Sequence, residues 1–92
     1  MIKSIKHSGL KKLYANGDTK GVCAGHVVRL QKRLAVLDAA TSLDDIAVHN
    51  WKLHPLGGKL KHQHALWVSG NWRLVFEFRG GDVYLLDYSD YH

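Results

Sequence analysis

The sequence has few residues that could constrain the chain covalently or conformationally. Its 92 residues include one cysteine, Cys23, and one proline, Pro55. A lone cysteine cannot form a disulfide within the chain, which fits a reducing compartment. No apolar run approaches the length of a membrane span, and residues 1–12 lack the apolar stretch of a signal peptide. We therefore expect a cytoplasmic protein that does not bind a membrane.

Internal repeats and low-complexity linkers are also missing from the sequence. A chain of this length rarely builds two cores, so we expect one domain over residues 1–92. Its 46% hydrophobic and 10% aromatic content is that of a globular protein rather than a disordered one. The core must be small, and a tightly bound partner would add to its stability by mass action.

Acidic residues are scarce in the N-terminal part of the chain. Residues 1–38 carry eight Lys and Arg against two Asp, whereas residues 65–92 carry two Arg against four acids. The formal net charge is +5. Clustered cations favour a nucleic-acid partner, because neutralising phosphates releases condensed counterions. Solvated helix surfaces would give the same pattern, and charge alone weights the two interpretations about equally.

Helical spacing dominates the first half, after a loosely alternating stretch at residues 1–6 that predicts a short strand. Ser8 can cap a short helix that ends at Asn16-Gly17 and places Leu10, Leu13 and Tyr14 on one face. A second helix is predicted over about residues 24–40. Its apolar stripe is Val27, Leu30, Leu34 and Leu37, with Arg29, Lys32 and Arg33 towards the opposite side. Thr41-Ser42 opens a further short turn, with Asp45 in a capping-box relation to Ser42.

The second half changes to the two-residue period of strands. Strands are predicted over residues 64–69, 72–78 and 83–88, joined by tight turns at residues 70–71 and 80–82. Links this short require antiparallel neighbours. The predicted fold class is α+β, a mainly antiparallel curved sheet with the two N-terminal helices packed on one face.

The alternation within residues 72–78 separates two sets of side chains. If the face of Trp72, Leu74, Phe76 and Phe78 meets the helices, Arg73 and Glu77 point to the open face. An arginine there is well placed to bind a phosphate bidentately. The pattern by itself favours the alternative, a surface arginine that pairs with Glu77 or Asp87.

Histidines are abundant, with seven in the chain. The pairs His62/His64 and Cys23/His26 have spacings that could share a metal ion, but neither has further ligands at structural-zinc spacing, so we expect no metal site. Pro55 holds His54 in an extended conformation beside the flexible Gly57-Gly58 pair. The terminal residues 90–92 offer several proton carriers, although a frayed tail is the simpler interpretation.

Several segments together resemble a known family. They are residues 52–56 (KLHPL), 71–76 (NWRLVF), Gly81-Asp82 and the terminal 90–92 (DYH), together with 1–4 (MIKS), 6–7, 9–10, 33–34, 37–38 and 40–41. The chain is similar from end to end to the HigB toxins of the RelE superfamily. The Trp-Arg-x-x-Phe strand is moderately specific alone and becomes strongly specific with Asp-Tyr-His at the C-terminus.

The resemblance implies a compact RelE-like α+β toxin of a type II toxin–antitoxin system. Such toxins cleave mRNA codons in the ribosomal A site without a metal or cofactor, by attack of the ribose 2′-hydroxyl on the adjacent phosphate. The family's catalytic positions fall on His54, Arg73, Asp90, Tyr91 and His92. The implied partners are a HigA-like antitoxin and the 70S ribosome with its mRNA, with DNA contacted only through the antitoxin complex.

The sequence also departs from the family pattern after residue 56. Gly57 stands where many members have lysine, so Lys59 or Lys61 is expected to supply the substrate contact. His64 replaces a tryptophan and is expected close to the cleft. The loss at Gly57 supports an alternative function, a RelE-like protein that binds RNA or the ribosome without cleavage and acts with its antitoxin as a co-regulator.

Overall fold

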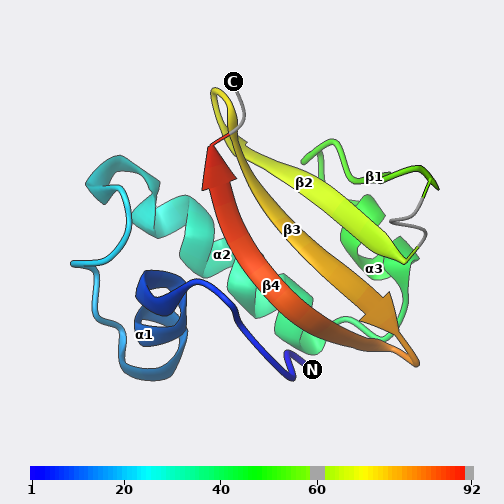
Figure 1. Cartoon of the computed structure of the whole chain (residues 1–92), viewed down its shortest axis with the longest axis horizontal. Helices are drawn as coiled ribbons and strands as arrows, with labels where there is room; N and C mark the ends of the chain where they lie inside the picture. The colour runs from blue at the N-terminus through cyan, green and yellow to red at the C-terminus, as the bar shows by residue number, and fades with distance from the viewer. Residues whose placement is uncertain (59–61, 91–92) are drawn as a thin grey trace.

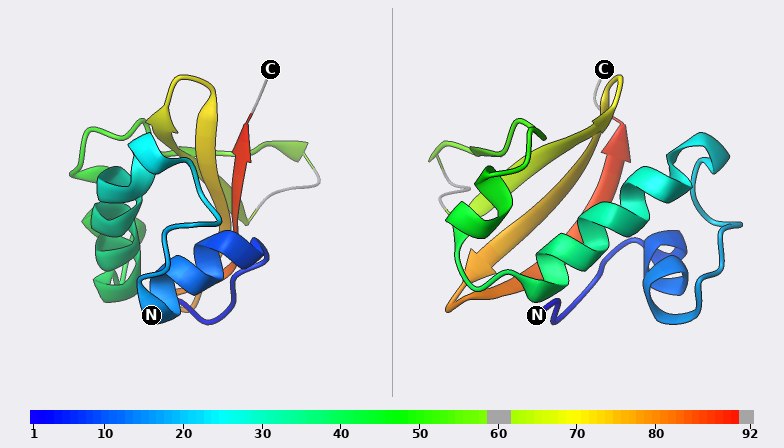
Figure 2. Two further views of the ribbon diagram at one scale, coloured as in Figure 1. Left: turned by 90° about the vertical axis from the view of Figure 1, so that its left-hand side faces the viewer. Right: turned by 180° about the vertical axis from the view of Figure 1, so that it is seen from behind.

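The computed structural model describes residues 1–58 and 62–90. Helices α1 (Ser8–Asn16), α2 (Val27–Ala39) and α3 (Leu43–Ala47) precede strands β1 (His54–Pro55), β2 (Gln63–Ser69), β3 (Trp72–Arg79) and β4 (Asp82–Asp90). The helices lie on one side of a curved antiparallel sheet of strand order β1-β2-β3-β4 (Figures 1 and 2). The α+β class and the helix-covered face were both predicted from the sequence.

Helix α1 is capped one residue earlier than predicted. The Nδ1 atom of His7 accepts a hydrogen bond from the Leu10 amide at 3.0 Å, so His7 is the cap and Ser8 the first helical residue. The predicted end is confirmed, since Gly17 adopts the left-handed conformation (φ +71°) that closes the helix. Leu10 and Leu13 are buried, whereas Tyr14 is exposed. The Tyr14 hydroxyl donates a hydrogen bond to Asp38 at 2.9 Å.

The second predicted helix begins as a 3-10 turn, Ala24–His26, and continues as α2. Leu30, Leu34 and Leu37 are buried as predicted. The placement of Arg33 on the polar side was wrong, since its side chain is only 4% exposed. The carbonyl oxygens of Trp67 in β2 and of Arg29 in α2 accept hydrogen bonds from its guanidinium there. At α3, Asp45 accepts from the Ser42 amide at 3.2 Å, which confirms the predicted capping relation.

Residues 1–6 do not form the predicted strand. They run parallel to β4 and meet it only at isolated bridges, Ile2 to Val83 and Ile5 to Leu86. The ladder is interrupted where Leu85 takes a positive φ of 54° and donates its amide to Ser4 Oγ at 2.8 Å. The predicted hairpins are present, although β4 already begins at Asp82, so its turn is shorter than expected.

The sheet has a core face and a bare face. Leu66, Leu74, Phe76 and Leu86 are buried against the helices, whereas Arg73, Val75 and Glu77 alternate with the β3 core residues, as predicted. Figure 2 shows the helices gathered on one side of the sheet. None of the helices within residues 1–58 and 62–90 is long and apolar enough to cross a membrane.

Candidate active site

His54 occupies the outer strand of the sheet. Strand β1 pairs with β2 so that His54 lies opposite Ala65, and its side chain is exposed. The ring Nδ1 is 2.8 Å from the Lys52 carbonyl oxygen. A carbonyl can only accept, so Nδ1 carries the hydrogen and Nε2 of the neutral ring carries the lone pair. His54 is therefore held in the tautomer whose Nε2 can accept a proton.

Arg73 projects from the same face as His54. Cross-strand partners share a face, and His54, Ala65 and Val75 form one row across the sheet. Arg73 belongs to the next row, opposite Trp67 and Ser89. Its Nη1 lies 3.4 Å from the carbonyl oxygens of Gly70 and Trp72, which are long, weak bonds that leave the guanidinium adjustable.

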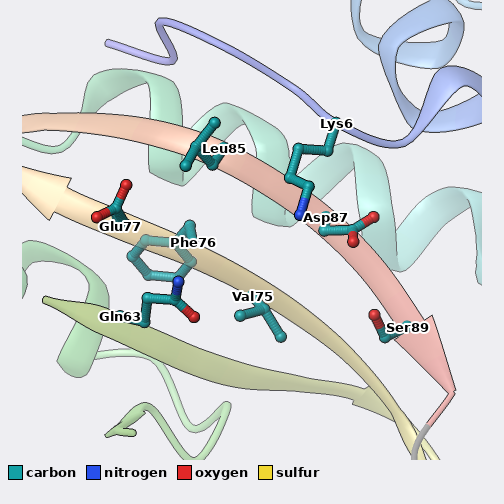
Figure 3. Close-up of a pocket in the computed structure, with 8 residues that line it drawn as sticks. All are labelled: Lys6, Gln63, Val75, Phe76, Glu77, Leu85, Asp87 and Ser89. Atoms are coloured by element: carbon teal, nitrogen blue, oxygen red, sulfur yellow. The ribbon is translucent and has the colours of Figure 1, made fainter. Parts of the chain in front are cut away.

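Among the described residues, Arg73 does not form the surface ion pair that the alternative interpretation predicts. Within residues 1–58 and 62–90 the single ion pair joins the N-terminal amine to Asp82 at 3.3 Å. Glu77 and Asp87 instead line a neighbouring cavity of about 150 Å³ with Lys6, Gln63, Val75 and Ser89, and Figure 3 shows these side chains on the bare face. The cation of Arg73 thus has no carboxylate partner among the described residues.

Asp90 ends β4, the strand that pairs with β3, on which Arg73 lies. It is exposed and pairs with Trp72, the residue before Arg73, so it projects from the core face. The candidates Tyr91 and His92, as well as Lys59 and Lys61, lie outside the described residues. The strand register therefore places His54 and Arg73 on the bare face, whereas Asp90 projects from the opposite, core face at the end of the adjoining strand.

His64 is the most enclosed of the candidates. It lies opposite Phe76, stacks on that ring at 6.1 Å between centroids, and so belongs to the core face. Its Nδ1 is buried without a hydrogen-bond partner among the described residues. Burial first, and then the charge of His54, lower the pKa of His64 below its ordinary value. The ring is therefore kept neutral, and a direct contact with substrate stays a prediction.

A cluster around Tyr88 was not identified from the sequence. The Tyr88 hydroxyl is 2.5 Å from His26 Nδ1, its ring stacks on Trp72 at 4.4 Å, and His7 meets it edge-on at 5.3 Å. We call these four residues the Tyr88 cluster. Burial, followed by hydrogen bonding with Cys23, holds the pKa of Tyr88 well above its usual value. The phenol therefore stays protonated two residues before Asp90.

Metal ligands do not gather elsewhere in the described ranges. Across residues 1–58 and 62–90, no group of three or more His, Cys, Asp or Glu side chains could hold a metal ion. The candidate side chains are instead a histidine in a defined tautomer, a guanidinium without a carboxylate partner among the described residues, and the carboxylate of Asp90 at the end of β4. Imidazole can exchange protons near neutral pH, and a guanidinium can neutralise a phosphoryl oxygen.

The fold and these side chains define a small basic α+β protein of RelE-like type. Residues 3–92 match the family described as the RelE-like toxin of the type II toxin–antitoxin system HigB, and the chain belongs to that family. It is 46% identical over 92 residues to Endoribonuclease HigB of Proteus vulgaris, and the match covers the whole of both chains. The resemblance inferred from the sequence motifs is thereby confirmed.

Proposed function

We propose that this protein is the endoribonuclease toxin of a type II toxin–antitoxin pair and that it cleaves mRNA codons in the ribosomal A site. The observation that carries the proposal is that His54 and Arg73 project from the same bare face of the sheet. The chain is also related along its whole length to an endoribonuclease. An imidazole that can accept a proton and a guanidinium that can neutralise a phosphoryl oxygen are groups that RNA cleavage by its own 2′-hydroxyl requires.

The reaction needs two proton transfers. A base removes the proton of the 2′-hydroxyl, whose oxygen forms a bond to the adjacent phosphorus. The bond from phosphorus to the 5′-oxygen breaks, and an acid protonates that leaving oxygen. The products are a 2′,3′-cyclic phosphate and a 5′-hydroxyl. His54 Nε2 can exchange one proton, the terminal group of Asp90, Tyr91 and His92 carries the other, and Arg73 neutralises charge on the phosphoryl oxygens. Side chains thus supply every proton step, without a metal or cofactor.

Substrate contacts complete the proposal. Lys59 and Lys61, which follow β1 in the chain, contact RNA phosphates in place of the lysine that many family members have at position 57. His64, which lies opposite Pro55 in the strand register, contributes a further contact to the substrate. The ribosome orients the 2′-hydroxyl in line with its leaving oxygen, because positioning is a large part of the barrier and a small domain has few groups for it.

The family implies an antitoxin partner, which we propose is HigA-like and binds the basic helical side of the toxin. Contact with DNA then occurs only through that complex, and both proteins act in the cytoplasm. Lys11 and Lys12 of α1 are exposed cations suited to an acidic partner surface.

The test is a translation assay with purified ribosomes. We expect translated mRNA to be cut within codons, mapped by primer extension, with ends that carry cyclic phosphate and 5′-hydroxyl, while naked mRNA survives. Rapid, specific cutting of naked mRNA would contradict ribosome dependence. Ribosome binding without any cleavage would establish the non-catalytic alternative that the glycine at position 57 supports.

A further inference from the structure

Two indole rings at the outer edge of β2 are each flanked by cationic or imidazole groups. His49 stacks on Trp51 with centroids 4.4 Å apart, and the guanidinium carbon of Arg33 lies 4.5 Å from the same ring centre. Two groups this close to one ring must occupy opposite faces. Arg29 and the Lys52 amine lie 5.6 and 5.5 Å from the Trp67 ring. We call these six residues the basic ledge.

Backbone carbonyls rather than carboxylates hold the two arginines in place. Arg29 Nη1 donates to the Val68 carbonyl at 3.0 Å, and Arg33 Nε donates to the Trp67 carbonyl at 2.9 Å. Arg33 Nη1 also donates to the Arg29 carbonyl at 3.1 Å. The one ion pair within the described ranges lies elsewhere, at Asp82, so the positive charge of the ledge is uncompensated there.

This arrangement carries an electrostatic cost in the isolated protein. Burial, and secondly the charge of Arg29, lower the pKa of Arg33. A stabilising role alone would be served as well by a carboxylate partner or an apolar side chain. Fixed cations beside half-buried indoles and an exposed imidazole are instead an arrangement that suits single-stranded nucleic acid, because phosphates pair with cations and bases stack on exposed rings.

The basic ledge adjoins the candidate active site directly. Trp67 lies opposite Arg73 in the strand register, and the Trp67 Nε1 and Arg73 Nη1 atoms point at the same Gly70 carbonyl oxygen, at 3.0 and 3.4 Å. Lys52 of the ledge holds His54 through its own carbonyl. A strand of RNA whose scissile phosphate lies at Arg73 therefore meets the ledge at its neighbouring nucleotide.

We propose that the basic ledge binds the single-stranded segment of substrate RNA that flanks the cleaved phosphate. Arg29 and Lys52 are exposed and contact phosphates of that segment. His49 is also exposed, and the outer face of its imidazole extends the stack of Trp51 and Arg33 by one base. Arg33 keeps Trp51 in place from behind. This subsite rests on the proposed function, because it takes the same RNA strand as the active site.

The experiment measures binding without cleavage. A fluorescent single-stranded RNA oligonucleotide with all 2′-hydroxyls methylated cannot be cut, and its anisotropy reports the affinity of the full chain over a series of salt concentrations. We expect Arg29→Ala and Lys52→Ala each to weaken binding by about 10-fold and to reduce the salt slope by roughly one contact. His49→Ala is expected to lose a similar factor with the salt slope unchanged, since stacking releases no counterions.

The matched control is Lys32→Ala, which removes an exposed cation of α2 outside the ledge. It is expected to change affinity less than twofold, and circular dichroism of every variant checks folding. The proposal is overturned if Lys32→Ala weakens binding as much as Arg29→Ala, or if the wild-type chain does not bind the oligonucleotide at low salt. It is also overturned if the ledge variants lose only antitoxin binding or only affinity for vacant ribosomes.

Failure of the ledge and failure of the proposed function give different results. Oligonucleotide binding that depends on Arg29 and Lys52, without cleavage of translated mRNA, would retain the ledge and reject the nuclease. Cleavage of translated mRNA, with oligonucleotide affinity unchanged in all three ledge variants, would retain the nuclease and reject the ledge.

Discussion

Two aromatic clusters lie close to Arg73, and they differ in what surrounds their rings. In the basic ledge, Trp51 and Trp67 are half-buried and flanked mainly by cations. In the Tyr88 cluster, the rings pack on one another and Tyr88 is only 5% exposed. The first arrangement supplies charge at the surface and the second fixes the end of β4. Under the proposed function, attraction of a polyanion and placement of proton carriers would fall to separate groups of residues.

The largest expected effect is a loss of cleavage rate from changing residues that belong to neither aromatic cluster. His92→Gln is expected to lower the rate of cleavage of translated mRNA by about 10²–10⁴-fold, the usual cost of a lost proton-transfer group. Arg73→Ala is expected to fall in the same range through lost charge neutralisation. Primer extension in the translation assay measures both. His62→Gln, a change at an exposed histidine, is the control, and full activity of the His92 variant would assign the chemistry to His54 and the lysine loop instead.

A packing change should disturb the Tyr88 cluster and leave the ledge intact. A Cβ at Gly9 would lie 2.1 Å from the Gly21 carbonyl oxygen, so Gly9→Ala must push α1 away from the loop that carries Cys23. We expect the free energy of unfolding to fall by about 1–3 kcal/mol. Urea denaturation measures it, and Gly25→Ala, where a Cβ meets nothing within 4 Å, is the control. Equal stability of the two variants would mean that α1 can shift without cost.

A smaller change tests the positioning role of the Tyr88 hydroxyl. Tyr88→Phe leaves His26 Nδ1 without its partner and is expected to lower kcat roughly 10-fold with KM unchanged, a loss of about 1.4 kcal/mol at the transition state. Kinetics on programmed ribosomes measure the split. A loss of folding stability with normal kcat would show that the hydroxyl serves the core alone.

The smallest effect concerns pH. The folded pKa of His64 lies below its unfolded value of about 6.5, so the unfolded chain binds more protons. The stability that neutral His64 contributes is present above pH 6.5 and is lost as the pH falls through the folded pKa. His64→Phe should flatten the decline of the thermal midpoint in that window. If the thermal midpoint of the variant falls with pH as steeply as that of the wild type, burial does not lower the pKa of His64.

The sequence predicted the sheet well because alternation and turn residues are local signals. Trp72 to Phe78 alternate strictly, and the glycines at positions 70 and 80 mark both hairpins. The position of Arg33 could not be predicted, since its carbonyl partner at Trp67 lies 34 residues away. For the same reason the contact of His26 with Tyr88, 62 residues apart, gave no local signal. Helical periodicity cannot distinguish an arginine exposed to solvent from one that meets the edge of a distant strand.

The sequence identified the residues of the candidate site, and the structure shows from which face of the sheet they project. His54 and Arg73 were named from the family motifs, and the strand register now places them on one face. The expected strand at residues 1–6 was wrong because the positive φ of Leu85 interrupts the ladder, and no pattern of side chains encodes that backbone conformation.

The pairing of residues 1–6 with β4 has a consequence for the order of assembly. Ile2 and Ile5 are made early in synthesis, but their partners Val83 and Leu86 lie on the strand that follows every other described element. Contacts of such long sequence separation form late and slowly. A nascent chain therefore lacks both its closing strand and Asp90 until β4 has been synthesised. The complete fold, with residues 1–6 paired to β4, therefore forms only after the last described strand has been made.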